Sequence, residues 1–279
     1  MNAPMIPHRE SRLPDLRFQF TPAIGMTAAQ KAPAPAIATS FVRAAVFGAS
    51  GGIGAALVAE LRRRNPACRI YAGSRSREPS GDPLVTPFAF DLRDAASIHA
   101  AALAIGAEGP LDLVFVATGA LVGPDGAGPE KSFKGITAQA LADQFAINTI
   151  GPALVAQAML PLLARDRRAV FAVLSARVGS IGDNRLGGWH GYRAAKAALN
   201  MLVRNFAIEL RRSHPLAVVV GLHPGTVDTP LSAPFQRGVP QAKLFTPETS
   251  AAQLLDTIAG LTPQDSGGLF AWDGAAIPF

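Results

Sequence analysis

The sequence contains almost no cysteine, and no apolar run in it is long enough to cross a lipid bilayer uninterrupted. Its single cysteine, Cys68, excludes an intramolecular disulfide and a thiolate-rich metal cluster, and is typical of a reducing compartment. Arg, Asp, Pro or Gly interrupts every apolar stretch before the roughly 20 residues that a spanning helix needs. We therefore expect a cytoplasmic protein with no membrane partner and no metal site.

Charged residues are also scarce, at 16% of the chain, and they are not clustered by sign. The net charge of +6 comes from 26 lysines and arginines against 20 acids, with the arginines scattered and without basic blocks. A nucleic-acid surface usually shows a basic stripe with interleaved aromatic residues, so no nucleic-acid partner is expected. The basic surface instead favours small anionic ligands.

Residues 1–40 differ in composition from the rest of the chain. They are rich in Pro and Ala and show neither a helical nor an alternating apolar period. Such a segment cannot bury a patterned apolar face, so we expect a flexible N-terminal arm. No linker divides the remainder, and residues 41–279 are predicted to form a single domain.

Short apolar runs alternate with longer Ala- and Leu-rich segments through that domain. The runs predict strands within 41–48, 69–73, 85–91, 111–119, 169–175 and 216–225, and the longer segments predict helices at 53–64, 94–104, 137–163 and 191–212. Strands without polar alternation are buried on both faces, which is typical of a parallel sheet. The pattern predicts an α/β fold with a doubly wound, mostly parallel sheet in three α/β/α layers, of the Rossmann type.

A glycine-rich turn, "FGASGGIGAAL", joins the first predicted strand to the first helix. Gly48, Gly52 and Gly54, with Ser50 and Ile53 between them, place backbone N–H groups at a helix N-terminus, where a pyrophosphate can approach only if side chains are absent. This position after an apolar strand predicts a dinucleotide site rather than an ordinary tight turn.

The residues after the next two strands bear on which dinucleotide binds. The second strand ends in Ser74 and Arg75 and has no carboxylate before Glu78. A carboxylate there would accept a hydrogen bond from a free ribose 2′-hydroxyl and would repel a 2′-phosphate. We therefore predict NADP(H) over NAD(H), the alternative being that Arg75 and Arg77 are solvated loop charges. Asp91, after the third strand, would either meet the adenine or cap the next helix.

Tyr192 and Lys196 lie four residues apart in the predicted helix 191–212, and therefore on one face. A nearby ammonium favours the phenolate, which would make the phenol usable as an acid and base on a carbonyl or alcohol. The chain has only two tyrosines, and Tyr71 lies in an apolar strand. Tyr192 is thus the one candidate for a phenolic acid.

These motifs, in this order, resemble those of a classical short-chain dehydrogenase/reductase. The resemblance covers residues 42–279: the glycine turn, Asn148 in "FAINTIGP", the Tyr192 and Lys196 pair, and "HPGTVDT" at 223–229. Further stretches, "GSIGDNRLGGW", "LHPGTVDTPLSAPFQ" and "FAWDGAAIPF", resemble the C-factor-like branch, which is related to the sniffer-type carbonyl reductases.

The resemblance implies a hydride exchanged between nicotinamide and a carbonyl or secondary alcohol. Tyr192 would exchange the proton, Lys196 would bind the nicotinamide ribose and lower the pKa of the phenol, and Asn148 would hold a water of the proton relay. Asn148 could instead be a helix-interior amide bonded to backbone. Further cofactor contacts are implied for Leu92, Ala117, Thr118, Gly119, Pro224, Gly225, Val227 and Thr229.

One family residue is missing from the pattern. Aligned on Gly179, the catalytic serine of the family falls at Ala176. Ser175 is the predicted replacement, although adjacent positions of a strand point to opposite faces of the sheet. Otherwise Ser180 or Asn184 would supply the hydrogen-bond donor to the substrate oxygen, or no such donor is present.

The sequence therefore predicts an NADP-dependent carbonyl reductase or alcohol dehydrogenase acting on a small molecule. The alternative is a dinucleotide-binding signalling or regulatory protein with little turnover. Residues 230–245 would form a mobile lid over an apolar ligand or a plain surface loop. The helix at 137–163 would either pair in a homodimer or homotetramer or cover the sheet, and Trp189 would line the pocket or the core.

Overall fold

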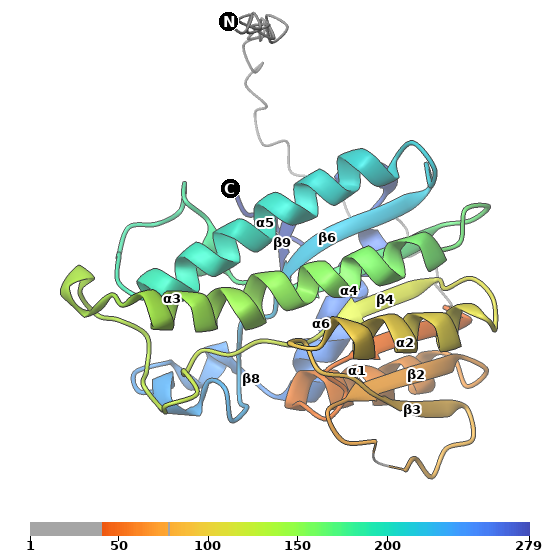
Figure 1. Cartoon of the computed structure of the whole chain (residues 1–279), viewed down its shortest axis with the longest axis horizontal. Helices are drawn as coiled ribbons and strands as arrows, with labels where there is room; N and C mark the ends of the chain where they lie inside the picture. Colours follow the sequence, from red (N-terminus) through yellow and green to blue (C-terminus); the bar gives the residue numbers. More distant parts are fainter. Residues whose placement is uncertain (1–40, 78) are drawn as a thin grey trace, which may run out of the picture. The chain divides into compact units, whose positions relative to one another are not determined.

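A sheet of seven strands forms the centre of the protein, in the order β3-β2-β1-β4-β5-β6-β9 and with every pairing parallel (Figure 1). The computed structural model describes residues 41–77 and 79–279, which belong to one compact unit. The arm predicted for residues 1–40 lies outside the described residues. The strands are β1 (Arg43–Phe47), β2 (Arg69–Ser74), β3 (Val85–Ala89), β4 (Leu113–Val116), β5 (Ala169–Leu174), β6 (Ala217–His223) and β9 (Leu269–Ala271).

Both faces of the sheet are buried, as the unbroken apolar strands predict. Within β1, Ala45 and Phe47 belong to one core cluster, whereas Ala44 and Val46 belong to the other. Alternate residues of a strand point to opposite faces, so each strand feeds both cores. Strand β3 pairs only with β2 among the described strands, and this edge position tolerates Pro87, which has no N–H to donate.

Helices cover the sheet on each side and complete the three predicted layers. Helices α2 (Ala95–Gly106), α4 (Gly151–Met159) and α5 (His190–Leu210) contribute to one core, and Figure 1 shows them side by side. Helices α1 (Gly52–Arg64) and α6 (Pro247–Gly260) contribute to the other core. The predicted α/β doubly wound fold is confirmed.

The predicted helix 137–163 is a continuous helical segment with a local irregularity. Helix α3 (Ala138–Phe145) passes through one π-helical turn (Ala146–Ile150) into α4 and ends in a 3₁₀ turn (Leu160–Leu162). By length and composition alone, Ala138–Leu162 would suffice to cross a membrane. Val155, Ala156 and Met159 are nevertheless fully buried in the core beside the sheet, so the segment is a core helix of this fold.

Several elements were not predicted from the sequence. Helix α6 begins at the capping residue Thr246, and β9 adds three residues to the sheet beside β6. A second, two-stranded parallel sheet joins β7 (Thr226–Val227) to β8 (Leu244–Phe245). This small sheet closes the segment 228–243 into a loop whose two ends lie together.

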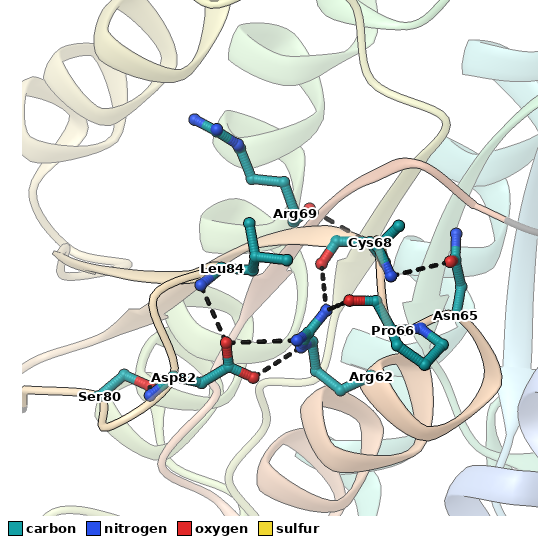
Figure 2. Close-up of polar contacts among 9 residues, drawn as sticks. Arg62, Asn65, Pro66, Cys68, Arg69, Ser80, Asp82 and Leu84 are labelled. Atoms are coloured by element: carbon teal, nitrogen blue, oxygen red, sulfur yellow. Dashed lines mark hydrogen bonds and ion pairs between the residues drawn. The ribbon is translucent and has the colours of Figure 1, made fainter.

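A polar cluster around Arg62 fastens the last turn of α1 to the loops on either side of β2 (Figure 2). The Arg62 guanidinium donates to Asp82 Oδ2 at 2.6 Å and to the Cys68 carbonyl at 3.1 Å, and also to the Pro66 carbonyl. Asp82 Oδ1 accepts from the Leu84 N–H at 2.9 Å. These bonds fix the far end of the helix whose first turn forms part of the candidate site.

Candidate functional site

A pocket of about 490 Å³ opens at the carboxyl ends of the strands, where ligands bind in open parallel sheets. Its lining comes from the turns after β1, β2, β3 and β4 and from the helical segment 143–147. Of the residues predicted to bind a cofactor, Gly48, Ser50, Ser74, Arg75, Asp91, Leu92, Ala117, Thr118 and Gly119 line it. The structure thus brings one half of the predicted site together.

The glycine turn has no room for a side chain at Gly48, Gly52 or Gly54. Gly48 has a φ of 93°, and a Cβ on Gly54 would lie 2.1 Å from the Gly48 carbonyl oxygen. The α1 N-cap, Gly51, makes no side-chain cap and also lines the pocket, although the sequence pattern did not single it out. Ile53 instead packs against the core beneath. The turn therefore leaves the first-turn N–H groups of α1 available to an anion.

The ends of β2 and β3 form the next part of the pocket wall. The Ser74 hydroxyl donates to the Ser76 carbonyl, and the exposed Arg75 follows it. Asp91 Oδ1 accepts from the Arg93 N–H at 2.8 Å, whereas the N-cap of α2 is Asp94, which accepts from the Ala96 N–H at 2.9 Å. The alternative that Asp91 caps this helix is wrong.

Polar atoms in the wall after β4 support a polar ligand in the pocket. Thr118 Oγ1 is buried and has no hydrogen-bond partner among the described residues. Buried hydroxyls are almost always paired, so an unpaired one that lines a pocket is suited to a bound polar group. A Cβ on Gly119 would lie 3.3 Å from Asn148 Oδ1 and 3.8 Å from Lys196 Nζ, so this glycine joins the pocket to the residues of α5.

Asn148 is fully buried in the π-helical turn and bonds to backbone outside its own helix. Its Nδ2 donates to the Ala120 carbonyl at 2.8 Å, and its Oδ1 accepts from the Ala120 N–H at 3.2 Å. Nδ2 also donates to Gln144 Oε1 at 2.9 Å. The amide thus fixes the loop after β4, and its predicted role in holding a relay water stays a prediction.

Tyr192 and Lys196 lie on one face of α5, as their spacing predicts. The Lys196 ammonium nitrogen lies 5.8 Å from the centroid of the Tyr192 ring and donates to the Leu174 carbonyl at the end of β5, at 2.8 Å. Both side chains are buried, with 9% of Tyr192 and 2% of Lys196 exposed. Strand β5 therefore determines where the lysine points, and the lysine lies beside the phenol.

The pKa values of this pair differ from the sequence expectation. Burial raises the pKa of Tyr192 to about 12 and lowers the pKa of Lys196 to about 7. Removal from water disfavours each charged form, and this effect dominates over the expected stabilisation of the phenolate by the ammonium. Tyr192 is consequently a protonated phenol at neutral pH, which is the form that can donate a proton.

Ser175 and Ala176 diverge at the end of β5. The Ser175 hydroxyl donates to Asn200 Oδ1 at 2.6 Å, and Asn200 lies eight residues beyond Tyr192 in α5, or about 12 Å along the helix. Ala176 instead packs in the apolar cluster that contains Tyr192. This geometry favours Ser175 as a brace between β5 and α5 over the donor role predicted for it.

The two alternative donors have local partners in the loop that follows β5. The buried Ser180 Oγ accepts from the Asp183 N–H at 3.0 Å, and Asn184 Oδ1 accepts from the Gly187 N–H at 3.0 Å. Both contacts are typical of side chains that stabilise turns. Neither contact indicates a bond toward Tyr192.

The segment after β6 meets the glycine turn, as expected for residues at the far end of a dinucleotide. A Cβ on Gly52 would lie 2.8 Å from Thr229 Cγ2. Gly225 has a φ of 78°, the Pro224 carbonyl accepts from Ser250 Oγ at 3.2 Å, and Val227 is buried in β7. Within 230–245, Leu231 would lie 3.9 Å from a Cβ on Gly119, so this segment reaches toward the pocket.

Some residues near the site carried no signal in the sequence. Gln144 and Arg93 line the pocket, and Glu130 accepts N–H bonds from the residues just before Tyr192. Each lies far from Tyr192 and Lys196 in sequence, so their spacing from that pair could not have revealed them. Among residues 41–77 and 79–279 no group of three His, Cys, Asp or Glu is placed to hold a metal.

The fold and the site together define an oxidoreductase family. The family model described as short chain dehydrogenase matches residues 43–239, which is most of the chain, and the chain belongs to this family. C-signal of Myxococcus xanthus is 39% identical over 139 residues, covering 50% of this chain and 78% of that protein. This similarity agrees with the C-factor-like resemblance of the motifs.

Solved carbonyl reductases share the fold over most of their length. The NADPH-bound carbonyl reductase from chicken fatty liver superposes with a TM-score of 0.74 at 25% identity, covering 85% of this chain and 94% of that one. The carbonyl reductase Sniffer of D. melanogaster superposes with a TM-score of 0.74 at 24% identity, covering 85% of this chain and 99% of that one. The predicted branch of the family is thus confirmed.

Proposed function

We propose that the protein is an NADP(H)-dependent oxidoreductase that interconverts a small carbonyl compound and its secondary alcohol, with Tyr192 as the proton donor and acceptor. The observation that carries this proposal is the buried pair of Tyr192 and Lys196 beside a glycine-lined pocket. The similarity to an NADPH-bound carbonyl reductase supports the same activity. A free buried thiol at Cys68 is consistent with a cytoplasmic location.

The residues of the pocket fit a dinucleotide. Gly48, Gly52 and Gly54 would leave the N-terminus of α1 open to its pyrophosphate, and Thr118 would pair its buried hydroxyl with it. Arg75, exposed at the pocket wall, would bind a 2′-phosphate, and no carboxylate in β2 opposes this. When bound, the cofactor supplies or accepts a hydride at its nicotinamide.

The remaining cofactor contacts would come from the other predicted residues. Asp91 and Leu92 would border the adenine, and Ala117 and Gly119 would lie along the middle of the molecule. Pro224, Gly225, Val227 and Thr229 would hold the nicotinamide end, because Thr229 already contacts the glycine turn.

The protein's own groups would manage the proton and the substrate oxygen. In the reducing direction the protonated Tyr192 donates its hydroxyl proton to the developing alkoxide. Lys196, held by the Leu174 carbonyl, would then return a proton toward the phenolate, and Asn148 would connect this site to solvent through a water. We propose that Tyr192 alone holds the carbonyl oxygen, because Ala176 occupies the position beside it and Ser175 bonds to Asn200.

A regulatory or signalling role with little turnover is the second candidate. The 39% identity to C-signal and the alanine at position 176 favour it over an unrelated binding function. In that case the dinucleotide would stabilise a conformation that a partner recognises. Turnover distinguishes the two proposals.

The deciding experiment measures NADPH oxidation with a broad panel of aldehydes and ketones. Carbonyl-dependent oxidation supports the enzyme, and tight NADPH binding without turnover across the panel supports the second candidate. Calorimetric titration of both cofactors should show NADPH binding at least about tenfold more tightly than NADH, or about 1.4 kcal/mol. Equal affinities, or a preference for NADH, would remove the assignment of Arg75.

A further inference from the structure

Trp189 has an unusual backbone conformation immediately before the catalytic helix. Its φ of 51° and ψ of 44° are left-handed, and it is the one non-glycine residue with positive φ among residues 41–77 and 79–279. The two residues before it, Gly187 and Gly188, have φ values of 63° and 66°. A side chain with a Cβ is strained in this region, so the surrounding structure must hold it there.

Glu130 provides that restraint from a distant loop. Its carbonyl accepts from the Trp189 N–H at 2.6 Å, and its carboxylate Oε2 accepts from the Gly191 N–H at 3.1 Å. One residue thus bonds to the chain on both sides of His190, at the start of α5. This double contact fixes the backbone from which the indole projects and the beginning of the helix that carries Tyr192.

The indole is held between two aromatic rings. Its centroid lies 6.3 Å from that of Tyr192, with an interplanar angle of 72°, and 5.4 Å from that of Phe235, with an angle of 65°. Both are edge-to-face contacts, the geometry that aromatic rings prefer. Phe235 belongs to the segment after β6, so the indole connects the proposed proton donor to the predicted lid.

Apolar side chains pack against this aromatic group in the same cluster. Leu121, Ala176 and Val178 complete the apolar cluster, and Ala176 replaces the hydroxyl that the family pattern has at this position. Trp189, Phe235 and Val178 are only half-buried. A substrate carbonyl that reaches Tyr192 would therefore place its substituent against apolar and aromatic side chains.

We propose that Trp189, held in the left-handed conformation by Glu130, is the specificity-determining residue of a substrate subsite that selects carbonyl compounds with a flat, apolar group next to the carbonyl. The turnover test of this inference rests on the proposed function, because it needs the protein to reduce carbonyl compounds. The binding test does not need that activity. An aromatic contact of this kind changes affinity by a factor of about 2 to 10 beyond that of burial alone.

The test compares acetophenone with cyclohexyl methyl ketone, which differ in having a flat or a puckered ring of the same carbon count. The ratio of their kcat/KM values is measured for the full chain and for Trp189→Leu and Trp189→Phe. Dividing each variant's ratio by that of the unmodified protein cancels the different intrinsic reactivities of the two ketones. We expect Trp189→Leu to lower the preference for acetophenone about three- to tenfold, and Trp189→Phe to retain most of it.

Matched variants keep the result interpretable. Phe133→Leu removes an aromatic ring that is 71% exposed, and should leave the ratio unchanged. Phe235→Leu tests the second ring if Trp189→Leu does not fold. Glu130→Ala should lower the ratio, whereas Glu130→Gln, whose amide oxygen can still accept the Gly191 N–H, should restore it. An unchanged ratio in both Trp189→Leu and Phe235→Leu overturns the proposal.

A binding measurement separates this inference from the proposed activity. Each ketone is titrated calorimetrically into the NADP⁺-loaded protein, where no reduction can occur. A preference for acetophenone that disappears in Trp189→Leu supports the subsite even if the protein reduces no carbonyl, in which case the proposed function alone fails. The subsite is overturned if both ketones are turned over and the ratio of their kcat/KM values is the same in all variants. It is also overturned if the protein neither binds nor reduces either ketone.

Discussion

The positions of Ser175 and Ala176 predict that two adjacent substitutions have opposite kinds of effect. Ser175→Ala removes the donor to Asn200 Oδ1, in a contact of 2.6 Å where both residues are only 3% exposed. A buried acceptor left unpaired costs about 1–3 kcal/mol. At roughly 2–4 °C per kcal/mol in a domain of this size, the melting temperature should fall by about 2–12 °C. We expect kcat to change less than about threefold.

Ala176→Ser should instead act on turnover. It places a hydroxyl in the cluster beside Tyr192, where Ala176 is 8% exposed. A hydrogen-bond donor to a developing oxyanion is commonly worth a factor of about 10² to 10³, so even an imperfectly aligned hydroxyl should raise kcat at least about tenfold. The added polar group should lower the melting temperature slightly because the cluster is apolar.

The assay is kcat/KM for one accepted carbonyl substrate, measured beside thermal unfolding for both variants. Ser180→Ala serves as the comparison, because Ser180 is equally buried but bonds within its own loop. A loss of about 100-fold in Ser175→Ala with an unchanged melting temperature would refute the reasoning. It would show that Ser175 donates to the substrate and that Asn200 is not its functional partner.

Two further predictions concern the glycine turn and the buried lysine. Gly54→Ala should lower the affinity for NADPH more than about tenfold and destabilise the protein by about 2 kcal/mol, because its Cβ would lie 2.1 Å from the Gly48 carbonyl oxygen. Calorimetric titration measures the affinity and urea unfolding measures the stability. Unchanged NADPH binding would contradict the prediction. Burial lowers the pKa of Lys196 to about 7, so above that pH the unfolded chain binds more protons than the folded one. Between pH 7.5 and 9.5 the free energy of unfolding should therefore rise more in the unmodified protein than in Lys196→Met. Equal rises in the two proteins would contradict the lowered pKa of Lys196.

Much of the fold and half of the site follow from local patterns in the sequence. Apolar runs separated by helical segments predict six of the strands, and the four-residue spacing of Tyr192 and Lys196 places them on one helix face. The missing elements had weaker signals. Strand β9 has three residues, too few for a pattern, and the one local sign of α6 is its short start signal "TPE".

The contacts that position the site join residues far apart in the chain and could not be predicted. Glu130 meets Gly191, and Phe235 meets Trp189, only because the sheet brings their loops to one edge. The pKa of Tyr192 was expected to fall, but it depends on burial, which spacing alone does not determine. The direction of Ser175 likewise depends on where β5 ends and on its packing against α5.

The central claim is that the Tyr192 hydroxyl transfers the proton in carbonyl reduction, and Tyr192→Phe tests it most directly. The substitution removes one buried oxygen and keeps the ring that contacts Trp189 and lies beside Lys196. We expect NADPH-dependent carbonyl turnover to fall at least about 100-fold, the usual size of a lost general acid, while the affinity for NADPH changes less than about threefold. Turnover that persists in Tyr192→Phe at the level of the unmodified protein would contradict the account.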